Sequence, residues 1–231
     1  MKWIHKLLLN ILKKGGHVPK KIAFIMDGNR RYAQQVLKAE KHLGHKHGLD
    51  RMIEAVEWCN IVGVKEVSVF ALSNDNLKRE KKEVDTLMNL AKEQFAKFVK
   101  HGSLFIENGI WIWVLGKLDL LPDDVKESLI KIEKETVECS NMVFNLYICY
   151  DSTTEMQDIL DEMKGEYTED KWESGMYGGY SVKPDILVRT SNEVRLSNFL
   201  LYQSKDSMIS YVKNYWPDFS VIDFIKIMIE Y

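Results

Sequence analysis

Cysteine is scarce in this chain of 231 residues, and its three cysteines form no closely spaced pair. An odd number of distant cysteines (Cys59, Cys139 and Cys149) favours buried free thiols in a reducing compartment over a disulfide framework or a zinc site. Long apolar runs are also missing, since no segment approaches the ~20 residues that a membrane-spanning helix requires.

A strong charge of either sign is absent as well. Lys and Arg number 32 and Asp and Glu number 34, which gives a net charge of −2. This balance gives no support to a nucleic-acid-binding protein, but it leaves room for a local basic pocket. The length is near the upper limit for one domain, so we expect an N-terminal helix over residues 1–17 and one domain over 18–231.

The N-terminal segment, MKWIHKLLLNILKKGG, carries apolar residues at helical spacing. Lysines interrupt the run and no small-residue cleavage site follows, which argues against a secretory signal. The pattern predicts an amphipathic helix with two open roles, docking on the protein's own core or contact with a membrane surface or partner. Its apolar side would be formed by Trp3, Ile4, Leu7, Leu8, Ile11 and Leu12.

Short apolar segments alternate with helical patterns along the rest of the chain. Wholly apolar runs of this length are typical of strands buried on both faces of a parallel sheet. The sequence therefore predicts an α/β fold with a mainly parallel six-stranded sheet flanked by helices. The expected strands are 22–26, 67–72, 111–115, 143–150, 186–188 and 208–212. The expected helices are 44–62, 80–100, 122–138, 152–164 and 220–230, and the weakly patterned stretch 165–184 predicts a surface connection.

Polar residues follow the first expected strand, at the edge where parallel sheets collect their ligands. A carboxylate there, Asp27, can hold a divalent cation, and Gly28 lets the backbone approach a ligand closely. Asn29 can donate hydrogen bonds, while Arg30 and Arg31 offer forked donors matched to phosphate oxygens. A capped turn with two solvated arginines is the alternative, but the buried strand before the motif favours a binding site.

Two further strand ends carry polar groups. The segment 73–79 (SNDNLKR) follows the second strand and, taken alone, is typical of a turn before a helix. After the fifth strand, Arg189, Arg195 and Ser197 can point into one anion site, with Glu193 orienting an arginine; a salt-bridged loop is the alternative. Together the three clusters predict a site for one or two diphosphates with Mg²⁺.

Two other patterns invite a metal-site interpretation. Asp123 and Asp124 open a helix after Pro122, where acidic residues favour the helix dipole, so capping is the better interpretation. The histidines at 42, 45 and 47 have no accompanying cysteine or second ligand set, which argues against zinc. His45 as a proton or phosphate partner stays open.

Three ordered segments, followed by WPDF, resemble the signature regions of cis-prenyltransferases: HVPKKIAFIMDGNRRYA, FALSNDNLKREKKEVDTLM and DILVRTSNEVRLSNFLLYQ. The resemblance extends from about residue 18 to the last residue and is weakest over 151–183. Undecaprenyl diphosphate synthase is the bacterial member of this family. Tyr32 and the Arg-Thr-Ser sequence at 189–191 are closer to its eukaryotic branch, the catalytic subunits of dehydrodolichyl diphosphate synthase.

The resemblance implies that farnesyl diphosphate is elongated by successive cis additions of isopentenyl diphosphate, for dolichol synthesis and protein glycosylation. It implies Mg²⁺ at Asp27, which assists diphosphate departure, and a part in proton removal for Asn29. The implied allylic diphosphate site comprises Gly28, Asn29, Arg30, Arg31, Lys41, His45 and Arg79. The implied isopentenyl diphosphate site comprises Arg189, Arg195 and Ser197, with Ser73 and Asn76 at the active-site mouth.

The growing chain is apolar and needs a dry tunnel. Strand 111–115 and one face of helix 80–100 could line it, although core packing is the alternative for each of these residues. That face comprises Leu87, Met88, Ala91, Phe95 and Phe98.

Several positions depart from the family pattern. Lys41 stands where the family usually has arginine, Asp75 replaces a glutamate, and Met208 aligns with a Mg²⁺-binding glutamate of the bacterial enzymes. The sequence ends at Tyr231 without the Arg-x-Gly tail that completes the diphosphate site of homodimeric members. The resemblance therefore implies a heteromer with a Nogo-B-receptor-like accessory subunit that supplies this motif, and peripheral association with the cytosolic face of the endoplasmic reticulum membrane.

Two other functions compete with this one. A non-catalytic scaffold subunit of the same fold typically loses the first motif, whereas this chain keeps Asp27, Arg30 and Arg31. A phosphatase with an aspartate nucleophile also begins with an apolar strand ending in Asp. It needs a second aspartate two residues later, where this chain has Asn29.

Overall fold

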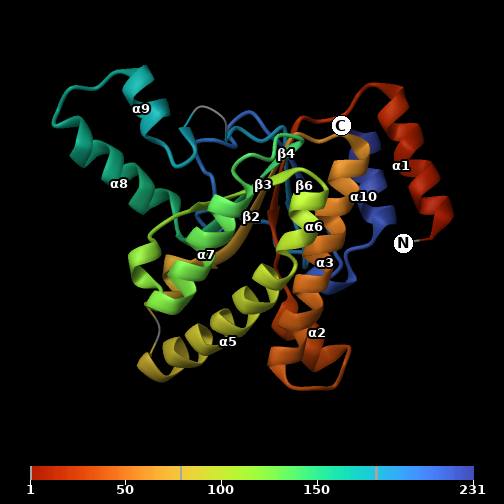
Figure 1. The fold of residues 1–231 in the computed structure, drawn as a ribbon, viewed down its shortest axis with the longest axis horizontal. Helices are drawn as coiled ribbons and strands as arrows, with labels where there is room; N and C mark the ends of the chain where they lie inside the picture. The colour runs from red at the N-terminus through yellow and green to blue at the C-terminus, as the bar shows by residue number, and fades with distance from the viewer. Residues whose placement is uncertain (1, 79, 180–181) are drawn as a thin grey trace.

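Six parallel strands form the centre of the molecule (Figure 1). The computed structural model describes residues 2–78, 80–179 and 182–231. The strand order is β3-β4-β2-β1-β5-β6, and every neighbouring pair is parallel. The strands are β1 (Lys21–Ile25), β2 (Glu66–Ser73), β3 (Ile110–Leu115), β4 (Met142–Tyr150), β5 (Ile186–Arg189) and β6 (Met208–Tyr211). The predicted six-stranded sheet is confirmed.

The long helices also form where they were expected. They are α1 (Trp3–Gly15), α3 (Lys41–Val62), α5 (Lys81–Lys100), α7 (Asp123–Thr136), α8 (Ser152–Met163) and α10 (Val221–Glu230). The shorter helices are α2 (Asn29–Gln35), α4 (Asn74–Leu77), α6 (Gly102–Glu107) and α9 (Glu169–Gly175). Helix α3 begins at Lys41 rather than at 44, so His45 belongs to its second turn.

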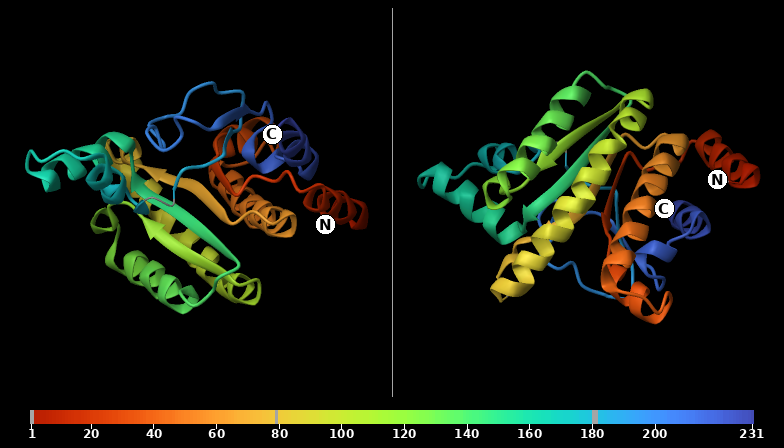
Figure 2. Two further views of the ribbon diagram at one scale, coloured as in Figure 1. Left: turned by 90° about the horizontal axis from the view of Figure 1, so that it is seen from above. Right: turned by 60° about the horizontal axis from the view of Figure 1, so that its bottom comes forward.

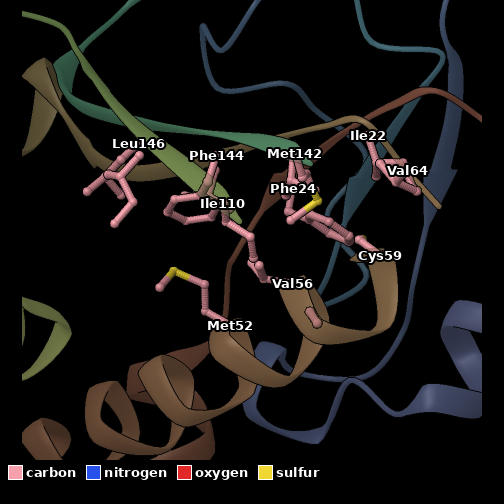
Figure 3. Packing of buried hydrophobic residues seen from close by; sticks show 14 of the residues in the cluster. Ile22, Phe24, Met52, Val56, Cys59, Val64, Ile110, Met142, Phe144 and Leu146 are labelled. Carbon is pink, nitrogen blue, oxygen red and sulfur yellow. The ribbon is translucent and has the colours of Figure 1, made fainter. Parts of the chain in front are cut away.

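Both faces of the sheet are buried, as the apolar runs predicted. On one face, Ile22, Phe24 and Phe144 share a cluster with Met52 and Val56 of α3 (Figure 3). Side chains of α5, α7 and α10 belong to the same cluster. The other face carries a second cluster, in which Ala23, Ile25, Tyr147 and Leu187 meet Val182, Phe199 and Leu200. The site therefore stands on strands that packing fixes from both sides.

The stretch 165–184 is more than the predicted surface connection. It contains α9, whose cap Thr168 accepts a hydrogen bond from the Lys171 amide, and it buries Met176 and Val182. Met176 packs with Ile159 and Met163 of α8. Residues 165–171 are exposed, as a surface connection predicts. The prediction missed α9 and the two buried residues because apolar residues set singly among charges give no detectable period.

Helix α1 packs against α3 and α10 at one end of the molecule, opposite α8 and α9 (Figure 2). Its apolar side is divided, contrary to the single stripe that the spacing predicted. Leu9, outside that stripe, is fully buried, and Leu8 and Leu12 pack partly against the core. The rest of the stripe faces outward: Trp3, Ile4, Leu7 and Ile11. Within the described ranges, no helix is long and apolar enough to cross a membrane.

Candidate active site

A cavity of about 650 Å³ opens at the carboxyl ends of β1, β2 and β5. The strand order reverses direction around β1, and ligands of open parallel sheets bind at such a point. The cavity lining includes Asp27, Gly28, Asn29, Arg30, Arg31, Lys41, His45, Ser73, Asn76, Arg189, Glu193, Arg195 and Ser197. The three clusters thus converge on one cavity. Arg79, also predicted for this site, lies outside the described residues.

Asp27, the second residue after β1, lies between two guanidinium groups. Its Oδ2 is 3.0 Å from Arg189 Nη2, and its Oδ1 is 3.3 Å from Arg31 Nη2. The Arg189 side chain is only 3% exposed. Because a buried cation is costly unless it is paired, this contact fixes the end of β5 against the end of β1.

Arg189 also reaches the third cluster. Its Nη1 donates to Ser197 Oγ at 2.7 Å and to the Arg195 carbonyl. Glu193 is the second carboxylate of the cavity and likewise lies between two guanidinium groups. Its Oε1 is 3.0 Å from Arg31 Nη1, and its Oε2 pairs with Arg195. The predicted contact between Glu193 and an arginine is therefore present twice.

Two hydroxyl groups that the sequence analysis missed hold the backbone of Asp27. Thr190 Oγ1 and Ser191 Oγ donate to the Asp27 carbonyl at 2.8 Å and 2.7 Å. Gly28 has a φ of 100°, and a Cβ there would overlap Ser191 Oγ and lie 2.7 Å from Tyr215 Cδ1. The close approach that requires this glycine is thus to the protein's own loops. The sequence feature that could have predicted these two contacts is the pair of hydroxyl residues directly after Arg189.

Arg30 and Lys41 line the cavity differently from the other cations. Across the part of the chain that the structure describes, neither forms an ion pair with a carboxylate. Their positive charge is therefore available to an anionic ligand. At the mouth, Asn76 donates to Ser73 Oγ, which fixes this polar pair at the end of β2.

A smaller apolar cavity of about 130 Å³ adjoins the polar one, and Asn29 and His45 line both. Burial, reinforced by the Arg30 charge, lowers the pKa of His45 to about 4, so the imidazole is neutral at neutral pH. Asn29 Oδ1 is buried and has no hydrogen-bond partner. The remaining lining is mainly apolar: Met26, Gly48, Leu49, Met52, Ala71, Leu72, Leu90, Ala91, Gln94, Phe95, Phe98, Leu146 and Trp216.

The predicted tunnel residues divide into two groups. Ala91, Phe95 and Phe98 line the apolar cavity, and Met88 packs beside the core. The placement of the Leu87 side chain lies outside what the structure describes. Among the described residues, 111–115 of β3 line neither cavity, and Ile112 and Val114 are buried in the core beside α7, which agrees with the core-packing alternative.

The donor set of the cavity fits Mg²⁺ bound together with a diphosphate. No group of three or more His, Cys, Asp or Glu able to hold a metal occurs among the described residues, whereas Asp27 and Glu193 both reach the cavity. Mg²⁺ is usually bound through one or two carboxylates plus substrate phosphates, so a full protein cage is not required. Asp123 and Asp124, by contrast, lie in the first turn of α7, where the helix dipole favours them, although the helix start has no side-chain cap hydrogen bond. Asp124 accepts a hydrogen bond from the Val125 amide and pairs with Lys92.

Sequence comparison identifies the class of enzymes to which this chain belongs, the prenyltransferases. Residues 25–231 match the model of the family described as "Putative undecaprenyl diphosphate synthase". The chain belongs to this family, the cis-prenyltransferases, whose members are prenyl diphosphate synthases.

Relatives from two domains of life are similar along most of the chain. The dehydrodolichyl diphosphate synthase complex subunit DHDDS of Homo sapiens is 36% identical, over 96% of this chain and 69% of that protein. The tritrans,polycis-undecaprenyl-diphosphate synthase (geranylgeranyl-diphosphate specific) of Thermococcus kodakarensis is 36% identical, over 94% and 86%. Among solved structures, lavandulyl diphosphate synthase of Lavandula x intermedia superposes with a TM-score of 0.84. It covers 93% of this chain and 95% of its own at 23% identity, which shows the shared fold.

Proposed function

We propose that this chain elongates farnesyl diphosphate with isopentenyl diphosphate in successive cis additions, giving a long-chain dehydrodolichyl diphosphate for dolichol synthesis and protein glycosylation. The observation that carries the proposal is the junction of the two cavities. A cation-lined cavity suits a diphosphate head, and the adjoining apolar cavity suits a hydrocarbon tail. Asn29 and His45, which line both cavities, would lie where head and tail meet.

In this proposal the allylic diphosphate binds beside Asp27, Arg30, Arg31, Lys41 and His45. Breaking the allylic C–O bond leaves negative charge on the departing diphosphate, and fixed cations stabilise that charge more than they stabilise the ground state. Mg²⁺ held by Asp27 and the diphosphate would supply further charge neutralisation. The neutral His45 can donate one hydrogen bond to a phosphate oxygen without adding charge.

The second substrate would bind to Arg189, Arg195 and Ser197. A new C–C bond joins the allylic carbon to isopentenyl diphosphate, a proton leaves the isopentenyl unit, and inorganic diphosphate is released. The unpartnered Oδ1 of Asn29 supports a part for this residue in the proton loss, because a free acceptor lies at the cavity junction. The site would then hold a diphosphate lengthened by one unit.

Incorporation of radiolabelled isopentenyl diphosphate into farnesyl diphosphate tests the proposal. Asp27→Asn keeps an acceptor oxygen for Arg189 but removes the carboxylate charge, so we expect loss of turnover with an unchanged circular dichroism spectrum. Asp161→Ala, which changes an exposed carboxylate of α8, is the matched control. Equal incorporation by wild type and Asp27→Asn would exclude Asp27 from the reaction. No incorporation by the wild type, either alone or with an accessory subunit, would favour the scaffold function instead.

We also propose a heteromeric enzyme, with a Nogo-B-receptor-like subunit that supplies an Arg-x-Gly segment to the diphosphate site. The human relative supports this, since its name describes a subunit of a complex. The assay is isopentenyl incorporation with and without such a subunit. We expect a clear rise when it is present, and full activity of the chain alone would contradict the proposal.

Peripheral association with the cytosolic face of the endoplasmic reticulum is a further part of the proposal. The outward side of α1 supports it, because Trp3 is 77% exposed beside Leu7 and Ile11, and lysines flank these residues. Cosedimentation with anionic vesicles should fall in Trp3→Ser. Leu160→Ser, an exposed leucine of α8, should leave it unchanged. Equal binding by both variants would contradict this role for α1.

A further inference from the structure

One buried carboxylate outside the cavity joins two of the loops that form it. Asp151 directly follows β4, is 4% exposed and is the N-cap of α8. Its Oδ1 accepts hydrogen bonds from the Thr154 amide at 2.7 Å and from Asn198 Nδ2 at 3.1 Å. Its Oδ2 accepts from Asn74 Nδ2 at 2.7 Å and from Thr154 Oγ1 at 2.8 Å. Four donors thus converge on one side chain.

The contact with Asn74 fixes the loop after β2. Asn74 is buried and is the first residue of α4, directly after Ser73. Ser73 and Asn76 line the mouth of the cavity on either side of it. By holding Asn74, the carboxylate of Asp151 therefore helps to fix the positions of Ser73 and Asn76 at the mouth.

The contact with Asn198 fixes the loop after β5, which has an unfavourable backbone. Ser197, Asn198 and Leu200 have φ values of 49°, 62° and 48°, in the left-handed region that residues with a Cβ rarely adopt. Such conformations persist only where the surroundings hold them. The start of α8 does so, since the Ser152 amide donates to the Asn198 carbonyl at 2.8 Å and the Leu201 amide donates to Ser152 Oγ at 2.9 Å.

This loop carries the groups that would receive the second substrate. Ser197 Oγ accepts from Arg189 Nη1, and the carbonyl of Arg195 accepts from the same guanidinium nitrogen. A shift of Asn198 would therefore move its neighbour Ser197 and change the contacts of Arg189. Asp151 thus holds Asn198 by a hydrogen bond, and the residue before Asn198 in the chain, Ser197, lines the cavity.

We propose that Asp151 is a positioning residue for the isopentenyl diphosphate subsite, because its carboxylate holds the loop of Ser197 and the loop of Ser73 in one arrangement. This inference rests on the proposed function, which assigns Arg189, Arg195 and Ser197 to that substrate. The ionised carboxylate suits the role, since only an acceptor with two oxygens can serve four donors. Burial alone would raise the pKa of Asp151, but hydrogen bonds from Thr154 and Asn74 outweigh it, so that the pKa lies below its ordinary value.

The test compares the two substrates in Asp151→Asn, assayed with the accessory subunit if activity requires it. Asparagine still caps α8 but turns one acceptor into a donor that faces Asn74. We expect the KM for isopentenyl diphosphate to rise on the order of tenfold or more. The KM for farnesyl diphosphate should change less, because the hydrogen bonds of Asp151 come from Thr154, Asn74 and Asn198 and not from Arg30, Lys41 or His45. An unchanged KM for isopentenyl diphosphate, or an equal rise for both substrates, would overturn the inference.

Two further variants separate positioning from stability. Asn74→Asp combined with Asp151→Asn restores one donor and one acceptor across the pair, so it should recover most of the lost affinity for isopentenyl diphosphate. Failure of this rescue, with a folded double variant, would count against the inference. Thr168→Ala removes the cap of α9, whose residues line neither cavity, and should leave both KM values unchanged.

Arg195→Ala distinguishes failure of this inference from failure of the proposed function. A raised KM for isopentenyl diphosphate in Arg195→Ala, beside a normal value in Asp151→Asn, would refute only the positioning role. A normal value in Arg195→Ala would refute the subsite assignment itself.

Discussion

Gly48 of α3 offers a way to displace Asn29 without changing Asn29 itself. A Cβ at position 48 would overlap Oδ1 of Asn29 and lie 2.9 Å from its Cγ. Ordinary van der Waals contact begins at 3.4 Å, so the amide must move by at least 0.5 Å, and further at Oδ1, which lies nearer. The obstacle is the end of a side chain, so the amide can turn while the backbone stays in place.

The expected result of Gly48→Ala is a folded but slow enzyme. Alanine in a helix interior is more stable than glycine by up to about 1 kcal/mol, which offsets part of the cost of moving the amide. A reactive group misplaced by about 1 Å can lower a rate on the order of a hundredfold. We therefore expect kcat to fall between ten- and a hundredfold, while Tm changes by only a few degrees.

Isopentenyl incorporation at saturating concentrations of both substrates, together with thermal denaturation, tests this prediction. Gly15→Ala is the control, because a Cβ at the end of α1 would meet no heavy atom within 4 Å. A wild-type kcat in Gly48→Ala would show that the amide of Asn29 is not needed where it lies. A large loss of Tm would show that the amide cannot turn aside, and would refute the reasoning on packing.

Three other predictions follow from burial and close packing. Gly44→Ala should lower the free energy of unfolding by about 3 kcal/mol in denaturant titrations, because its Cβ would overlap the backbone carbonyl of the first residue of α2; an unchanged midpoint would contradict this. Since the pKa of His45 falls from 6.5 to about 4 on folding, the unfolded chain binds more protons between these values. Stability should therefore decrease by up to about 3 kcal/mol as the pH falls from 6.5 to 4, and His45→Gln should flatten this dependence; an equally steep curve in the variant would refute the assignment. Burial raises the pKa of Cys59 and raises that of Cys149 to about 12, so both remain protonated thiols at pH 8 and are shielded from reagents. A thiol reagent at pH 8 should therefore modify the half-buried Cys139 first, and rapid reaction of all three thiols would contradict the packing.

The sheet was predictable because its strands are buried on both faces, which leaves uninterrupted apolar runs such as 22–26 and 67–72. Parallel strands place their carboxyl ends on one edge, so polar residues after three separate strands had to lie near one another. The convergence of Asp27, Ser73 and Arg189 follows from that geometry.

Contacts made by irregular backbone were not predictable in the same way. Thr190 and Ser191 donate hydrogen bonds to the Asp27 carbonyl from a turn in which Ser191 has a φ of 77°. The spacing of apolar residues in the sequence does not predict such a turn. The bridge from Asp151 to Asn198 depends on another left-handed segment. The division of α1 into an inner and an outer apolar side was not predictable either. Leu9 is buried in the core where α1 packs against α3 and α10, and the sequence of α1 alone does not specify these partners.

The arrangement of each cavity carboxylate between two guanidinium groups has a consequence beyond the cavity. Five cationic and two acidic side chains occur in its described lining, an excess of three positive charges in a chain whose net charge is −2. The opening is thus an electropositive spot on a molecule that is weakly anionic elsewhere. This electrostatic potential attracts polyanions toward the opening over several ångströms, whereas the weakly negative remaining surface repels them. Electrostatic steering of the substrate therefore begins before any contact is made.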